Sequence, residues 1–267
     1  MTGTYFFAPK ARGWDIISGS LRDRRPVLLL LDYDGTVIPI KSRPDFAVLP
    51  SPTRKLIESV AAHPGIYLGF VTGRSLNDIW GKIKNENLFY LANHGFQIKV
   101  GKYNWVHPQA KRTAHLLSAV CRDLETILDQ VDGFEIEDKL LTLSVHYRNM
   151  KNWPEARLKE TVANTVQPHA DKLRISGGKK VIEIRPKESW DKGEVILKII
   201  KLLHFPEPPL VIYIGDDLTD EDVFRILKKD QIGIKVGKSA KTAAGYYLRN
   251  PQEVLKLLRL MDKTLSG

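Results

Sequence analysis

Two aspartates, Asp32 and Asp34, follow the apolar run Val27–Leu31 and precede Gly35. Such a run is typical of a strand buried on both faces. Because side chains alternate along an extended chain, the two carboxylates point to the same side, and two like charges so close are costly unless a cation lies between them. The pair is therefore suited to metal-assisted phosphoryl transfer, in which one carboxylate faces phosphorus and a neighbouring group supplies a proton.

Two other interpretations of this segment explain less. An EF-hand loop begins in the same way, but it needs glycine at its sixth position, where this chain has Val37. A turn capped by Asp32 would use one carboxylate and leave the second unexplained.

Two further apolar runs also end in polar residues. Residues 66–71 precede Thr72-Gly73-Arg74, and residues 210–214 precede the segment GDDLTDED. Strands that alternate with helices form a parallel sheet, and such sheets bind ligands just outside the carboxyl ends of their strands. We therefore expect the three clusters to meet at one crevice.

Each cluster supplies a part of the expected chemistry. Thr72 and the amides after it, at a helix N-terminus, form a phosphate cradle. Asp216 and Asp217 lie at a strand end, where a hard cation would face Asp32. The acidic residues from Asp220 onward are accounted for by the helix dipole, whereas Lys192, at the start of a predicted helix, is mildly unfavourable there unless an anion lies nearby.

The middle of the chain has a different pattern. An αββαββ order is predicted, with helices at 110–130 and 153–166 and strands at 134–138, 140–148, 173–176 and 180–186, the last two joined by a turn at Gly177-Gly178. The pattern then returns to alternating helices and strands. We expect an α/β core with a parallel sheet (residues 1–107 and 188–267) that is interrupted by an inserted α+β cap domain (residues 108–187).

The motifs resemble those of a known family. DYDGT, VTGR, Lys192 and GDDLTDED, in this order, resemble the four motifs of the haloacid-dehalogenase superfamily, and ANHG, EDKLLTLSVHYR, GKKVIEIRP and WDKG resemble trehalose-6-phosphate phosphatases in particular. The resemblance runs from about residue 26 to residue 258. It implies a haloacid-dehalogenase-like Rossmannoid core and Mg²⁺-dependent hydrolysis of trehalose 6-phosphate.

The resemblance also implies residue roles. Asp32 attacks phosphorus and Asp34 exchanges protons with the sugar oxygen and with water. Thr72 and Lys192 hold the phosphoryl oxygens. Mg²⁺ is held by Asp32, the backbone carbonyl of Asp34 and Asp216, with Asp217 in an outer position. The residues expected to bind substrate are Arg74, Asn93, His94, Glu137, Lys139, Arg148, Lys179 and Glu183. For Arg74 two other roles stay open, to orient the site or to tie its helix to the cap.

For the cap residues a simpler interpretation stays open. Glu137 and Lys139 are two apart, and Lys179 and Glu183 four apart, so each pair lies on one face of a strand. They could equally form exposed cross-strand ion pairs that contribute little to stability.

Composition limits the partners. Hydrophobic residues are 43% and charged residues 27% of the chain, no apolar run is long enough to cross a bilayer, and the first residues lack the order of a signal peptide. These features predict a cytoplasmic protein.

The net charge of +10 is spread along the chain without a basic arm, which predicts no nucleic-acid partner. The one cysteine, Cys121, excludes an internal disulfide.

Two alternatives remain. The substrate could be sucrose 6-phosphate or a mannosyl phosphate. The domain could also be a catalytically silent sugar-phosphate sensor, although its four motifs are intact.

We expect the protein to be a monomer. A trehalose-phosphate synthase with which it could associate would be a separate protein, because this chain carries no glycosyltransferase half.

Overall fold

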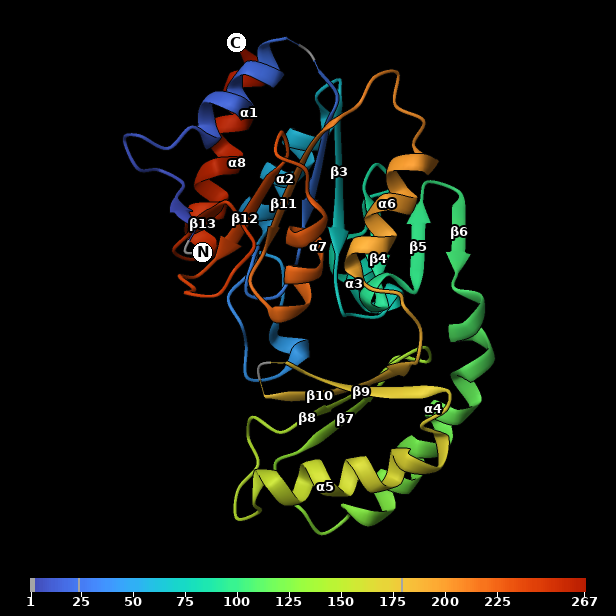
Figure 1. The fold of residues 1–267 in the computed structure, drawn as a ribbon. Helices are drawn as coiled ribbons and strands as arrows, with labels where there is room; N and C mark the ends of the chain where they lie inside the picture. Colours follow the sequence, from blue (N-terminus) through green and yellow to red (C-terminus); the bar gives the residue numbers. More distant parts are fainter. Residues whose placement is uncertain (1–2, 24, 179) are drawn as a thin grey trace. The chain divides into compact units, whose positions relative to one another are not determined.

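The chain folds into two compact units (Figure 1). The computed structural model describes residues 3–23, 25–178 and 180–267. One unit, which we call the core unit, comprises Met1–Asn104 and Trp190–Gly267, and the other, the inserted unit, comprises Trp105–Ser189. Within the described residues, no helix combines the length and the apolar character that crossing a membrane requires.

The core unit is built on a mainly parallel sheet. Neighbouring strands are parallel from β1 to β4, and β5 pairs antiparallel with β4. In spatial order the described strands are β1 (Thr4–Tyr5), β13 (Tyr246–Leu248), β12 (Ile232–Val236), β11 (Leu210–Gly215), β2 (Val27–Leu31), β3 (Ile66–Val71), β4 (Phe89–Ala92), β5 (Gln97–Val100) and β6 (Tyr103–Val106). The expected parallel sheet is confirmed.

Helices cover both faces of this sheet. One group packs with Leu29 and Leu31 in a single apolar cluster: α1 (Gly13–Arg22), α2 (Ser51–Ala62), α3 (Leu76–Ile83) and α8 (Pro251–Ser266). Tyr213 alternates with the residues of that cluster and contacts Phe224 of α7 (Glu221–Ile226), so α7 lies on the opposite face. It packs there beside α6 (Lys192–Leu202).

The order of the strands explains where a site can form. β2 lies between β11 and β3, with Leu31 paired to Ile214 on one side and to Phe70 on the other. All five residues of β2 are buried. Because the three strands run in the same direction, the polar residues that follow them emerge at one edge of the sheet.

The inserted unit has the predicted αββαββ order. It consists of α4 (Pro108–Ile127), β7 (Glu135–Asp138), β8 (Leu143–His146), α5 (Glu155–Val166), β9 (Leu173–Gly178) and β10 (Val181–Pro186), and its antiparallel strands lie in the order β7-β8-β10-β9. Apolar side chains on one face of this sheet, such as Val145 and Ile182, pack with Leu117 and Leu158 of the two helices.

The predicted turn at Gly177-Gly178 is wrong. Both glycines are paired in β9, Gly177 with Ile182 and Gly178 with Val181, so the strand is longer than expected. Lys180 adopts a φ of 64°, so a lysine takes the left-handed conformation that glycine usually provides. The helix expected at 110–130 also ends earlier, at Ile127.

Candidate active site

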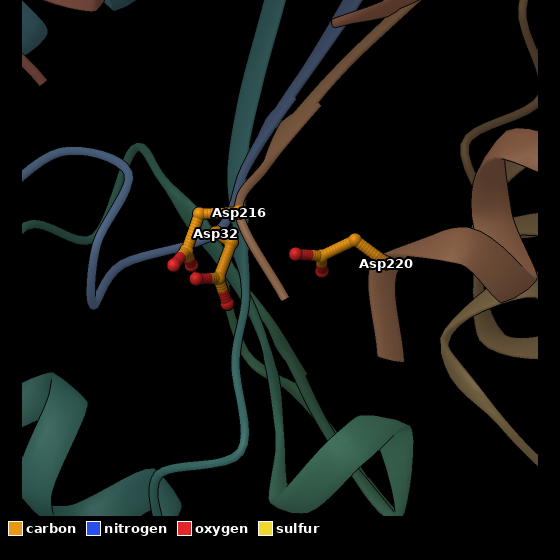
Figure 2. Close-up of side chains that lie close together, drawn as sticks. All are labelled: Asp32, Asp216 and Asp220. Carbon is orange, nitrogen blue, oxygen red and sulfur yellow. The ribbon is translucent and has the colours of Figure 1, made fainter. Parts of the chain in front are cut away.

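Asp32 and Asp216 lie side by side at the ends of β2 and β11. The backbone N–H of Asp32 donates to the carbonyl of Ile214 over 2.9 Å, and both aspartates are 6% exposed. Figure 2 shows their carboxylates pointing to the same side. Gly35 makes room for this pair, because a Cβ atom there would lie 2.3 Å from Oδ2 of Asp216. The glycine of the DYDGT motif is therefore required by this contact and by its φ of 80°.

Lys192 joins Asp32 to a third aspartate. Its Nζ lies 2.9 Å from Oδ1 of Asp32 and 2.7 Å from Oδ1 of Asp220. Asp220 is fully buried and also accepts hydrogen bonds from the hydroxyl of Tyr213, at 2.6 Å, and from the N–H of Asp217, at 2.8 Å. The mildly unfavourable helix position of Lys192 is thus offset by two carboxylates.

Sequence reasoning missed Asp220, because the helix dipole already accounted for an acidic residue there. A signal was available in Gly215. A Cβ atom at this position would lie 2.3 Å from Cγ of Asp220, so the glycine before the two aspartates marks a carboxylate packed against the strand end.

The buried charges shift the pKa values of this cluster. Burial raises the pKa of Asp32, against the effect of Lys192, and the neighbouring Asp220 and Asp216 raise it further. Burial also opposes ionisation of Asp220, but Lys192 and the hydrogen bond from Tyr213 lower its pKa. One ammonium thus faces a cluster of three buried carboxylates, an arrangement that favours a further cation.

The residues fit a divalent cation. Carboxylate oxygens of Asp32, Asp216 and Asp220 lie within 4.8 Å of one another, and hard oxygen donors are the ligands that such ions prefer. Asp220 accepts hydrogen bonds from Lys192 and Tyr213, whereas Asp32 and Asp216 lie side by side at the strand ends. The carboxylate of Asp217, a predicted ligand, forms a capping box with Asp220 at the short helix Leu218–Asp220.

Thr72 lies in a loop fixed by backbone hydrogen bonds. It is 2% exposed at the end of β3, its carbonyl accepts from the N–H of His94 over 2.9 Å, and the N–H of Asn93 donates to the carbonyl of Arg74 over 2.7 Å. Asn93 and His94 have φ values of 49° and 56°. The structure thus brings Asn93 and His94 beside the predicted phosphate cradle.

Arg74 contacts Asp34 through a two-pronged ion pair. Its Nε donates to Oδ2 over 2.5 Å and its Nη2 donates to Oδ1 over 2.8 Å. The guanidinium also donates to Asp78 and, over 3.0 Å, to the carbonyl of Pro44. The side chain of Asp34 is thereby held by an arginine that the sequence had assigned to substrate.

The polar face of the inserted sheet carries a second cluster. Glu137 of β7, Ser144 of β8 and Glu183 of β10 are paired across neighbouring strands. The hydroxyl of Ser144 donates to Oε1 of Glu183 over 2.8 Å, and Nζ of Lys139 lies 3.5 Å from the same oxygen. Lys139 and Glu183 are 6% and 7% exposed, so this network is not the exposed ion-pair arrangement that the sequence left open.

His146 and Ser144 were not predicted, although they alternate along the segment SVHYR. Nε2 of His146 lies 3.1 Å from Oε2 of Glu137, and Nζ of Lys139 lies 3.8 Å from that oxygen. Burial raises the pKa of Glu137, but Lys139 and His146 outweigh it, so its pKa is lowered overall. Arg148 is exposed after β8, and Lys179 lies outside the described residues.

The class of protein is defined by the sheet, the charged cluster and the inserted unit together. Two aspartates at strand ends of a parallel α/β sheet, a lysine that joins one of them to a third aspartate, and an inserted α+β unit are the features of a haloacid-dehalogenase-type phosphatase. The trehalose-phosphatase family model matches residues 30–252, so the chain belongs to this family.

Two curated plant proteins and one solved structure are similar to this chain. A probable trehalose-phosphate phosphatase 3 of Oryza sativa subsp. japonica is 33% identical over 276 residues, which cover 96% of this chain and 74% of the rice protein. Trehalose 6-phosphate phosphatase RA3 of Zea mays is 33% identical over 253 residues, or 88% of this chain and 69% of the maize protein. The C-terminal domain of the C. albicans trehalose-6-phosphate phosphatase has the same fold, with a TM-score of 0.81 at 23% identity over 98% of both chains.

Proposed function

We propose that the protein is a Mg²⁺-dependent phosphatase that hydrolyses trehalose 6-phosphate to trehalose and phosphate. The observation that carries this proposal is the cluster of buried carboxylates in which Lys192 is bound to Asp32 and Asp220 while Asp216 lies beside Asp32. The relatives' names point to the sugar.

The reaction proceeds in two displacements. A carboxylate oxygen of Asp32 forms a bond to phosphorus as the bond to the sugar oxygen breaks, which gives an aspartyl-phosphate. Asp34 donates a proton to the leaving sugar oxygen. Water then attacks phosphorus, Asp34 takes its proton, and Asp32 is regenerated with release of phosphate.

The surrounding residues hold the transferred group. Lys192 and the Thr72 loop bind the phosphoryl oxygens, whose charge spreads in the transition state. Asp32, Asp216 and the carbonyl of Asp34 would hold Mg²⁺, with Asp217 as a further candidate, and the bound ion would supply positive charge to these oxygens.

The inserted unit is the cap domain of this proposal, and its polar face recognises the disaccharide. The residues assigned to sugar hydroxyls are Glu137, Lys139, Arg148, Lys179 and Glu183, and Asn93 and His94 of the core unit are assigned to the bound substrate. Charged side chains held in a network suit this task, because they present fixed donors and acceptors to hydroxyl groups.

Phosphate release from trehalose 6-phosphate tests the proposed function. Asp32→Asn is expected to lower turnover by at least about 10³-fold, because the amide cannot accept phosphorus. EDTA should abolish release and excess Mg²⁺ should restore it. Asp123→Asn, an exposed position on α4, is the matched control and should keep the wild-type rate.

The same assay separates the rivals. Faster phosphate release from sucrose 6-phosphate or a mannosyl phosphate than from trehalose 6-phosphate would identify that compound as the substrate. Binding of trehalose 6-phosphate without turnover would show that the protein is a sugar-phosphate sensor and not an enzyme. Full activity of the Asp32→Asn variant would refute the assignment of Asp32 as the nucleophile.

Glu183→Gln tests the cap network. It keeps the side-chain shape but removes the charge that Ser144 and Lys139 contact. A hydrogen bond to a charged group contributes about 1.5–3 kcal/mol, so KM for trehalose 6-phosphate should rise about tenfold or more, with kcat changed less. Steady-state kinetics of this variant are compared with those of the control Glu160→Gln, which changes an exposed residue. An unchanged KM would show that Glu183 does not bind the sugar.

Three properties stay predictions from the sequence. We propose a cytoplasmic monomer that can associate with a separate trehalose-phosphate synthase. Cell fractionation, light scattering of the purified protein and co-purification with the synthase test these properties in turn.

A further inference from the structure

Arg74 uses most of its hydrogen-bonding capacity within the protein. A guanidinium has about five N–H donors. In Arg74, Nε and Nη2 donate to the two oxygens of Asp34, Nη2 also donates to the carbonyl of Pro44, and Nη1 donates to Asp78. At 6% exposure the side chain also has little free surface. These contacts leave little with which to bind a substrate.

The contacts fix the arginine on several sides. Its guanidinium carbon lies 5.3 Å from the ring centre of Tyr33, and the hydroxyl of that buried tyrosine donates to the carbonyl of Ala47 over 3.0 Å. The N–H of Arg74 donates to Oγ1 of Thr72 over 3.2 Å. Arg74 is therefore held between the loop after β2 and the loop after β3.

A planar fork bound to both oxygens of a carboxylate fixes its orientation as well as its position. Asp34 itself is 36% exposed in its side chain, so little packing restrains it. Without the fork, rotation about its side-chain bonds would spread the carboxylate over several positions. Proton transfer needs the acid or base within hydrogen-bond reach of the reacting oxygen.

We propose that Arg74 is a positioning residue that holds Asp34 for proton transfer rather than a residue that binds the substrate. This inference rests on the proposed function, in which Asp34 protonates the leaving oxygen and activates water. Loss of Arg74 then impairs the steps that use Asp34 and leaves substrate affinity nearly unchanged.

Steady-state kinetics of Arg74→Gln give the first test. The kcat for trehalose 6-phosphate should fall by about 10²-fold, within the range that general acid–base catalysis contributes, while KM changes less than about threefold. Arg74→Lys keeps the charge but not the fork, and it should lose most of the same rate. A large rise in KM with kcat unchanged would overturn the proposal in favour of substrate binding.

A double-mutant cycle with Asp34→Asn gives the second test. If Arg74 acts through Asp34, adding Arg74→Gln to Asp34→Asn should change the residual rate by less than about twofold, because residues that act as a unit are not additive. An equal loss in both backgrounds would overturn the proposal. Melting temperatures of all variants show whether they remain folded.

The leaving group gives a third readout. p-Nitrophenolate leaves without prior protonation, so the first-turnover burst of p-nitrophenol from p-nitrophenyl phosphate should slow far less in Arg74→Gln than turnover of trehalose 6-phosphate does. A burst slowed by the same factor as sugar phosphate turnover would contradict the proposal.

Failure of the proposed function is distinguishable from failure of this inference. If the wild type hydrolyses p-nitrophenyl phosphate but not trehalose 6-phosphate, the sugar assignment fails while the cycle still tests Arg74 on the aryl substrate. If neither is hydrolysed, a crystal structure of Arg74→Gln decides. A displaced or disordered Asp34 carboxylate supports the positioning role, and an unmoved one overturns it.

Discussion

Replacing Lys192 with methionine is expected to abolish phosphate release and to lower the free energy of unfolding by about 3–5 kcal/mol. The ammonium is 3% exposed and is bound to both Asp32 and Asp220. Its loss leaves the buried carboxylate of Asp220 without its cation. A phosphate-release assay measures the first effect, and urea denaturation measures the loss of stability.

Two companion variants sharpen this prediction. Lys201→Met removes an exposed lysine from the last turn of the same helix, and it should cost less than about 1 kcal/mol. Adding Asp220→Asn to Lys192→Met removes the stranded charge, so part of the stability should return while activity stays absent. A Lys192→Met protein as stable as the Lys201→Met control would mean that the buried charges are neutralised in another way.

Gly35→Ala is expected to lower phosphate release by more than about 10²-fold by displacing a cation ligand. Its added methyl group would meet Oδ2 of Asp216 at 2.3 Å, so that carboxylate must leave its place beside Asp32. The Mg²⁺ concentration that gives half-maximal activity should rise, and a titration of residual activity with Mg²⁺ measures this shift.

Gly65→Ala is the matched control for this variant. Gly65 has a φ of 82°, against 80° for Gly35, but a Cβ atom there meets nothing within 4 Å. Both variants therefore carry the same backbone strain of about 1–2 kcal/mol, and only Gly35→Ala carries the clash. Equal activity in the two would show that the contact with Asp216 does not govern metal binding.

The sequence was sufficient to predict the strands and helices that carry the candidate site. Apolar runs that end in polar residues predicted β2, β3 and β11, and the alternation with helices predicted their parallel pairing, because burial on both faces leaves a strong local pattern. The αββαββ order of the inserted unit was equally local. β4 to β6 were missed, since they are strands of four residues with weak alternation.

The partners of the charged residues could not be predicted in this way. Asp220 had a sufficient local explanation in the helix dipole, and its partner Lys192 lies 28 residues earlier. Arg74 and Asp34 are 40 residues apart. Such pairs depend on side-chain geometry in the folded sheet, which periodicity and spacing do not encode.

The central place of β2 affects how the protein is made. One neighbour, β3, is translated shortly after it, but the other, β11, begins only at Leu210. Until the ribosome has synthesised that segment, an apolar strand keeps one unpaired edge, which is a template for aggregation. We therefore expect nascent chains of this protein to be more prone to aggregation until the segment that begins at Leu210 has been synthesised.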